Sequence, residues 1–309
     1  MKRSNWQIML HLVGLVKPLA GYMILAILMG LMGHLCATFI TVFAGFAVLH
    51  GLGAAAPATV GLLFACMGLF ALVRGLLRYA EQACNHFIAF KLLALIRDRV
   101  FRALRRLCPA KLEGKDKGDL ISVITSDIEL LEVFYAHTIS PAAIALLFCV
   151  IMCLFTGAYH PVLGLVALAA YLVVGVGIPV LTSKYSGDVG LRFRGKSGDL
   201  SSFVLDSLRG LPEILQYHAG GKRLEEMNQR TGALSRDEAR MKRISGRNAA
   251  VTNGIILLFD LVMLLVSAGL YRQGSLGFDG VLIPTLALMG SFGPVVALAA
   301  LGSTLQNTF

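Results

Sequence analysis

The chain contains long stretches of sequence without charged side chains, and this pattern limits its fold more than any other feature. Residues 18–73 and 133–183 hold no Lys, Arg, Asp or Glu, residues 248–271 hold only Asp260, and no charge follows Asp279. A run of about 20 apolar residues is long enough to cross a bilayer as a helix. The chain is 56% hydrophobic and only 15% charged, so a soluble fold could not cover its apolar surface. We therefore predict an integral membrane protein and exclude a soluble enzyme, a disordered tail and a disulfide-rich secreted module.

Three breaks divide the uncharged stretches into six predicted membrane-spanning helices. The breaks lie at residues 50–57, 156–161 and 273–277, and each contains Gly or Pro at turn-forming positions. Pro161 suits the first turn of a helix, so the fourth span is expected to begin there. The predicted fold class is an all-α membrane protein, with spans near residues 18–49, 59–80, 137–157, 161–182, 250–271 and 280–309.

The net charge of +10 predicts which side of the membrane each connection faces. The breaks hold no Lys or Arg except for Arg272 at the edge of the third, whereas nearly all other basic residues lie at the N-terminus or in residues 74–132 and 184–247. Segments rich in Lys and Arg stay in the cytoplasm. We expect a multi-pass protein of the inner (plasma) membrane with a cytoplasmic N-terminus, in which residues 1–17 form an interfacial elbow helix.

The two basic stretches are predicted to be long helical hairpins rather than ordinary loops. Over residues 74–107 apolar side chains recur at helical spacing, and Pro109 ends the pattern. Counted from Thr59, this helix has roughly 49 residues and is about 75 Å long, while the hydrocarbon core is only about 30 Å thick. The return helix is expected to begin near Asp119, a plausible N-cap. The second basic stretch repeats the plan, with a turn between residues 210 and 221.

This plan resembles the transmembrane domain of ABC exporters, and specific residues agree with it. The run from Pro109 through Gly118-Asp119-Leu120 to Asp127 is similar to the first intracellular loop of that family. Within the family, the chain resembles the CydC/CydD thiol-reductant exporters needed for cytochrome bd assembly, and CydC in particular. The matching residues are Arg78, Tyr79, Ala80, Glu81, His86, Phe90, Arg97, Pro109, Gly118, Asp119, Leu120, Asp127, Tyr135, Ser140 and Pro141.

The resemblance implies partners for the chain. Family members carry an ATPase domain after their sixth span, so we expect one beyond residue 309, with ATP and Mg bound there, and we interpret this chain as part of a longer transporter. A second half-transporter is expected to complete a dimer, most plausibly a heterodimer. The chain itself is expected to hold no cofactor or metal, although the resemblance admits haem. The lipid bilayer is the other expected partner. We do not expect the chain to bind nucleic acid.

The two hairpin turns are expected to pass movement between the ATPase domains and the membrane helices. The alternative is that they are only solvated tips of helical hairpins. The residues assigned to coupling are Pro109, Lys111, Gly118, Asp119, Tyr217, His218 and Gly220.

A polar stripe on the second span is the main candidate for a substrate pathway. Its members fall at positions i, i+4, i+7, i+8 and i+11 of a helix, so they share one face. A charge facing lipid at the bilayer centre costs about 2.5–3.5 kcal/mol, which favours a cavity-facing or headgroup-level position. The stripe could bind a substrate carboxylate through guanidinium groups, or an internal Arg–Glu pair could fix helix packing, and the two are compatible. The members are Arg74, Arg78, Glu81, Gln82 and Asn85.

Two histidines are further candidates. The resemblance places His86 where CydC-type exporters have a histidine linked to haem binding, and imidazole can ligate haem iron. The alternative for His86 is a hydrogen-bonded residue at the membrane edge. His34, in the first span, is predicted either to line the pathway or to be packed between helices.

Residues 190–197 match the G-x-x-x-x-G-K-[ST] pattern of a phosphate-binding P-loop, and residues 255–260 imitate a Walker B strand. A P-loop functions only between a strand and a helix, where backbone N–H groups can surround the phosphates. Here the pattern follows a membrane span and contains bulky Arg and Phe. We therefore predict that this segment is a basic helix face.

The six cysteines predict no disulfide framework and no metal site. Four lie in predicted spans and two on the cytoplasmic side. Cys149 and Cys153 are one helical turn apart, but two thiols are too few for a typical structural metal site. We interpret them as small packing residues.

The resemblance implies the permease part of an ATP-driven exporter, and three alternatives remain. The substrates implied by the resemblance are small thiols, such as cysteine or glutathione, or haem. A lipid, peptide or drug exporter is one alternative, and a secondary carrier without an ATPase partner is another. A soluble P-loop NTPase is the third, and it predicts extraction without detergent.

Overall fold

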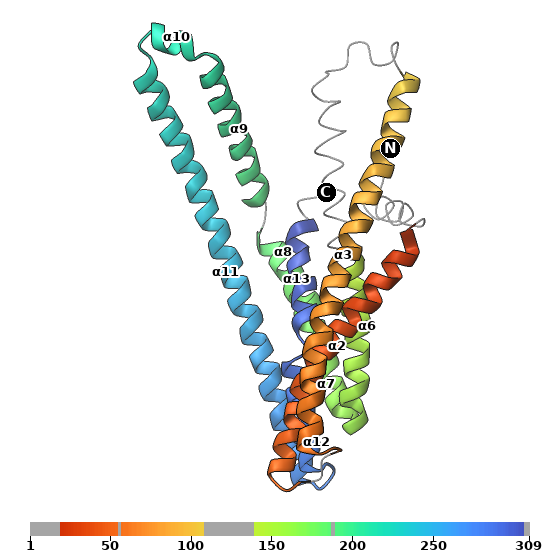
Figure 1. Cartoon of the computed structure of the whole chain (residues 1–309). Helices are drawn as coiled ribbons and strands as arrows, with labels where there is room; N and C mark the ends of the chain where they lie inside the picture. Colours follow the sequence, from red (N-terminus) through yellow and green to blue (C-terminus); the bar gives the residue numbers. More distant parts are fainter. Residues whose placement is uncertain (1–18, 55–56, 108–138, 187–188, 306–309) are drawn as a thin grey trace. The chain divides into compact units, whose positions relative to one another are not determined.

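The computed structural model describes residues 19–54, 57–107, 139–186 and 189–305, and every regular element in these ranges is helical (Figure 1). Six of the helical segments are long and apolar enough to cross a membrane, which confirms the predicted all-α fold with six spans. The helices that provide them are α2 (Ala20–Gly51), α3 (Val60–Leu107), α6 (Ser140–Tyr159), α7 (Pro161–Leu172) with its continuation, α11 (Gly220–Arg272), and α12 (Phe278–Met289) with α13 (Gly293–Leu305).

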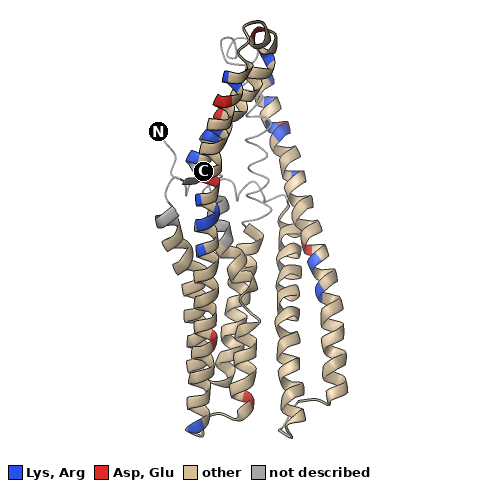
Figure 2. Ribbon diagram, turned by 90° about the vertical axis from the view of Figure 1, so that its left-hand side faces the viewer, with Lys and Arg blue, Asp and Glu red and all other residues tan. Residues whose placement is uncertain are grey.

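Helices α3 and α11 are much longer than a membrane is thick. With 48 and 53 residues, they measure about 72 Å and 80 Å, against roughly 30 Å of hydrocarbon. Figure 2 shows the membrane spans almost free of charged residues, whereas Lys and Arg gather along the helical extensions. The predicted continuation of the second span, and the predicted return into the fifth, are therefore both confirmed as uninterrupted helices.

The chain divides into two compact units, residues 1–177 with 256–309 and residues 178–255. We call the first the membrane unit and the second the hairpin unit. The hairpin unit contains α8 (Ile178–Ser186), α9 (Val189–Arg209), α10 (Leu211–Gln216) and the first part of α11.

Within the hairpin unit, polar contacts hold α9 against α11. The ring of Phe203 is buried beneath the guanidinium groups of Arg223 and Arg230, which lie 3.8 and 4.4 Å from its centroid. Cation–π contacts of this kind stabilise by about 0.5–1 kcal/mol when they are exposed. The Nζ atom of Lys196 also donates to Asp237 Oδ2 at 2.6 Å. Side chains thus connect α9 to α11 at two places along the hairpin. The charge pattern alone did not predict these contacts.

The tip of this hairpin is more ordered than the sequence predicted. Instead of a single turn between residues 210 and 221, a short helix, α10, occupies the middle, with Pro212 in its first turn. The prediction placed the turn across Gln216, but α10 includes that residue and the connection to α11 is residues 217–219. Pro212 explains the difference, because proline is pre-organised for the start of a helix.

The P-loop match has no structural counterpart. Residues 190–197 lie inside α9, so their backbone N–H groups are turned along the helix rather than around a phosphate. The motif lysine, Lys196, pairs with Asp237, and Asp260 lies within α11 rather than in a strand. The interpretation of this segment as a basic helix face is confirmed.

Spans four and six depart from the continuous helices that the sequence predicted. Span four changes after α7 into one turn of π-helix, η4 (Val173–Gly177). The sixth span, predicted as a single helix over residues 280–309, is interrupted between Met289 and Gly293. The physical reason is Pro294, which has no N–H to donate to the carbonyl of Gly290 four residues earlier. The hydroxyl of Thr38 donates to that Gly290 oxygen instead, at 3.1 Å.

Helices α6 and α7 form a tight antiparallel pair joined by His160 alone. Pro161 occupies the first turn of α7, as predicted, and the backbone N–H of Val162 donates to His160 Nδ1 at 3.3 Å. The pair can approach closely because Gly157 and Gly164 face each other. A Cβ atom built on Gly164 would lie 3.0 Å from the Gly157 Cα atom. Small residues at such positions are how membrane helices pack closely.

Candidate functional site

The polar stripe on α3 separates into an exposed part and a buried part. Arg74, Arg78 and Gln82 are exposed and line an open depression of about 520 Å³ together with Ala71, Gly75 and Tyr79. We call these six residues the arginine face. Glu81 and Asn85 are instead only 3% and 4% exposed.

Helical geometry explains much of this separation. Each i, i+4 step rotates by about 40° around a helix of 3.6 residues per turn. The row that continues from Arg78 through Gln82 to His86 therefore turns away from the side of α3 that packs in the core. Glu81 and Asn85 lie on the packed side, with Ile88 and Leu92.

Arg78 and Glu81 form an ion pair within α3. The Arg78 Nη1 atom donates to Glu81 Oε2 at 2.7 Å, and the Arg78 side chain is 52% exposed while that of Glu81 is 4% exposed. The Glu81 carboxyl lies against α2, since a Cβ atom on Gly30 would be 2.9 Å from Glu81 Cδ. The predicted internal pair is thus present. Arg78 also lines the depression, and its guanidinium group has five N–H donors in all.

His34 belongs to the same neighbourhood. It is half-buried on α2, edge-on to the ring of Phe148 with centroids 6.1 Å apart, and it interacts electrostatically with Arg74 and Arg78. A Cβ atom on Gly293, at the start of α13, would lie 3.9 Å from His34 Nδ1. The structure therefore brings His34, the arginine face and the interruption of span six close together in one unit.

His86 lies one turn beyond Gln82 on the exposed row of α3. Its ring stacks on that of Phe90, with centroids 6.1 Å apart and planes inclined by 24°. Both residues are exposed. The imidazole is thus held beside an aromatic surface in continuation of the arginine face.

The predicted coupling residues are only partly visible. Tyr217, His218 and Gly220 are exposed at the connection between α10 and α11, and His218 has a positive φ of 51°. The other predicted members, Pro109, Lys111, Gly118 and Asp119, lie outside the described residues, as does the predicted elbow helix at residues 1–17.

Hydroxyl groups surround the interruption of span six, and the sequence analysis did not identify most of them. The buried hydroxyls of Tyr171 and Ser291 share a hydrogen bond of 2.6 Å, and Ser291 Oγ also lies 2.7 Å from the carbonyl oxygen of Leu288. Thr41 Oγ1 donates to the carbonyl of Thr38 at 2.7 Å. The signal that could have revealed this site is the Gly290-Ser291-Phe292-Gly293-Pro294 segment within an apolar run.

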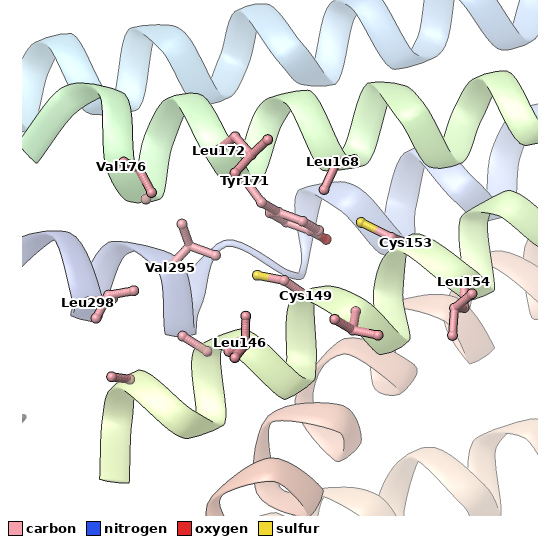
Figure 3. Close-up of a pocket in the computed structure, with 14 residues that line it drawn as sticks. Leu146, Cys149, Cys153, Leu154, Leu168, Tyr171, Leu172, Val176, Val295 and Leu298 are labelled. Atoms are coloured by element: carbon pink, nitrogen blue, oxygen red, sulfur yellow. The ribbon is translucent and has the colours of Figure 1, made fainter. Parts of the chain in front are cut away.

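An apolar cavity of about 320 Å³ lies next to this interruption, between α6, the α7–η4 segment and α13 (Figure 3). We call it the α6–α13 cavity. Figure 3 shows Cys149 and Cys153 on α6 facing Tyr171, with Val295 of α13 nearby. The sequence analysis treated the two cysteines only as packing residues, because nothing in a single sequence shows that three helices leave space beside them.

Asp260 is a buried carboxyl group of the membrane unit. Its residue is 8% exposed on α11, and its Oδ1 atom has no hydrogen-bond partner among the described residues. Intramembrane ionisable residues are rare because they are costly to bury. Asp260 interacts electrostatically with Tyr171, so it lies near the hydroxyl cluster.

Comparison with known proteins places this arrangement in a family. Residues 23–295 match the ABC transporter transmembrane region. A probable ABC transporter ATP-binding/permease protein of Haemophilus influenzae is 40% identical over 308 residues, which cover 100% of this chain and 56% of that protein.

Two further relatives are described as glutathione/L-cysteine transport system ATP-binding/permease proteins. CydC of Haemophilus influenzae is 25% identical over 67% of this chain and 37% of its own length. CydD of Bacillus subtilis is 25% identical over 89% of this chain and 47% of its own length. The chain thus spans about half the length, or less, of the curated relatives it matches. With six candidate spans and a family match over most of its length, the chain belongs to the ABC transporter transmembrane-region family.

Proposed function

We propose that the transporter containing this chain exports small anionic thiols, such as glutathione or cysteine, and that the arginine face binds their carboxylates. The observation that carries this proposal is the exposure of Arg74 and Arg78 on a membrane-spanning helix beside Gln82. Guanidinium groups bind carboxylates through paired, charge-assisted hydrogen bonds. The CydC and CydD relatives are glutathione/L-cysteine transport proteins, which supports a thiol substrate.

The proposal includes an ATPase domain and a second half-transporter. The relatives are ATP-binding/permease proteins, which supports ATP and Mg as the energy source and counts against a secondary carrier. Closure of the ATPase domains would move the turn at Tyr217–Ala219 and, through α11, the membrane spans. The charge distribution supports a cytoplasmic N-terminus and an inner-membrane location.

An anionic substrate without a thiol is the second candidate. The relative that is 40% identical has no substrate in its description and is distinct from CydC of the same species, which is only 25% identical. The arginine face would serve either candidate, because guanidinium groups recognise the carboxylate and not the sulfur. A lipid, peptide or drug with an acidic group also falls in this class.

Substrate-stimulated ATPase activity of the reconstituted transporter tests the proposal. Arg74→Gln should raise the KM for glutathione about tenfold or more, because a hydrogen bond to a charged group contributes about 1.5–3 kcal/mol. Arg99→Gln is the matched control, since Arg99 is also exposed on α3 but lies outside the arginine face. If neither glutathione nor cysteine stimulates the ATPase activity, these thiols are excluded as substrates. If the KM of Arg74→Gln is unchanged, the arginine face is excluded as the binding site.

We also propose that His86 ligates haem when the transporter binds it. An exposed imidazole stacked on Phe90 offers one axial ligand and an apolar surface for a porphyrin. His86→Ala should abolish the Soret shift of added haem, whereas His50→Ala, at the far end of α2, should not. A Soret shift that persists in His86→Ala would exclude this residue as the ligand.

A further inference from the structure

The α6–α13 cavity is almost entirely apolar, which restricts what can occupy it. Among the described residues that line it, the polar side chains are Cys149, Cys153 and Tyr171, and the Tyr171 hydroxyl is already bonded to Ser291. Water needs two to four polar partners to remain in a cavity, and apolar cavities stay dry. The volume of about 320 Å³ lies within the range of roughly 300–1,000 Å³ that is typical of ligand sites. Its occupant should therefore be a hydrocarbon.

The cavity opens toward the outer surface of the spans. Leu146 and Leu154 on α6 line it and are 68% and 69% exposed, and Leu172 on α7 is also exposed. These residues belong to spans three and four, both of which are highly apolar. The mouth of the cavity is therefore continuous with an apolar surface at the depth of the bilayer hydrocarbon, which places lipid chains next to it.

Backbone irregularities and small residues keep the cavity open. Gly175 of η4 approaches α13 so closely that a Cβ atom on it would be 3.0 Å from Val295 Cγ1. Ala142 and Ala145 line the α6 side, where longer side chains would fill the space. A π-helical turn often marks a functional site, and here it forms a wall of the cavity beside the interrupted span six.

From these observations we propose that the α6–α13 cavity binds one acyl chain of a membrane phospholipid, inserted between α6 and α13. The chain fills an apolar space that would otherwise be empty, and it contacts α13 just beyond the interruption of span six. The site is separate from the arginine face, so the proposal does not depend on the transported substrate.

Photo-crosslinking in nanodiscs tests this proposal on the assembled transporter. A phosphatidylethanolamine with a diazirine in its acyl chain is the probe, and mass spectrometry locates the adducts. Adducts are expected on cavity residues of α6, η4 and α13. Val150→Trp, which places a bulky ring in the cavity, should reduce this adduct yield at least fivefold.

Leu147→Trp is the matched control, because Leu147 is exposed on the same helix but does not line the cavity. Its cavity adducts should remain at the wild-type yield. Ala142→Leu, which fills the other end of the cavity, should also reduce the adduct yield. A second variant is needed in case one of them misfolds, and size-exclusion profiles of Val150→Trp and Ala142→Leu check that each is folded. Adducts spread evenly over α6 and insensitive to Val150→Trp would overturn the proposal, as would cavity adducts replaced by contacts with the second half-transporter.

Discussion

Replacing Arg78 by leucine is expected to lower the free energy of unfolding in the membrane by about 3 kcal/mol, the lower end of the range for breaking a buried ion pair. The carboxyl of Glu81, which is 4% exposed, would lose the Nη1 donor that lies 2.7 Å away. It would be left charged against Gly30, where water cannot replace the guanidinium. The lower end applies because Arg78 itself is half exposed.

The double variant Arg78→Leu/Glu81→Gln separates this explanation from a general loss of packing. Removing the acid together with its partner should recover most of the lost stability, because no unpaired charge remains. Arg74→Leu is the control: Arg74 lies on the same exposed face without an ion pair to Glu81. Unfolding in mixed micelles of lipid and SDS measures all three variants. Equal losses in the single and double variants would contradict the role given to Glu81.

Gly164→Val is expected to be the most damaging single change in the membrane unit by packing alone. A Cβ atom at Gly164 would lie 3.0 Å from the Cys153 carbonyl oxygen and 3.0 Å from the Gly157 Cα atom. Both are backbone atoms, which cannot rotate aside as a side chain can, so α6 and α7 would have to separate. Overpacking costs typically about 1–3 kcal/mol and occasionally more, and we expect a cost at the upper end.

The opposing glycine provides a sharp control. A Cβ atom on Gly157 would meet only the Gly164 Cα atom, at an ordinary distance of 3.7 Å. Gly157→Ala should therefore keep the folded yield and melting temperature close to those of the wild type, while Gly164→Ala lowers both and Gly164→Val lowers them further. Fluorescence-detected thermal unfolding of the detergent-solubilised protein measures the difference. Equal tolerance at the two positions would show that the contact between α6 and α7 is not tight.

The number of spans and the long extensions were predictable because they depend on where charge is absent. The gap over residues 18–73 and the basic run after it are properties of single segments, and α2 and α3 follow them closely. The pairing of Arg78 with Glu81 was also readable, since residues i and i+3 are neighbours on any helix.

The interruption of span six and the α6–α13 cavity were not predictable in the same way. Pro294 was visible, but Pro284 lies in the same apolar run and α12 continues through it, so a proline alone does not specify an interruption rather than a kink. What decides between them is the hydroxyl of Thr38, some 250 residues away in sequence, at the freed carbonyl of Gly290. The cavity similarly depends on three helices and on the π-helical turn at Val173–Gly177, so no local pattern specifies it.

The contact between Thr38 and Gly290 has a consequence for engineering the transporter. The conformation of span six depends partly on span one, because the hydroxyl that bonds the freed Gly290 carbonyl belongs to Thr38 of α2. Chimeras that exchange span six between relatives must therefore carry the threonine-bearing part of span one with it. If a donor span six is placed beside a host helix that lacks this hydroxyl, the carbonyl of Gly290 is left without a hydrogen bond inside the membrane. The contact that holds the junction of α12 and α13 against span one is then lost.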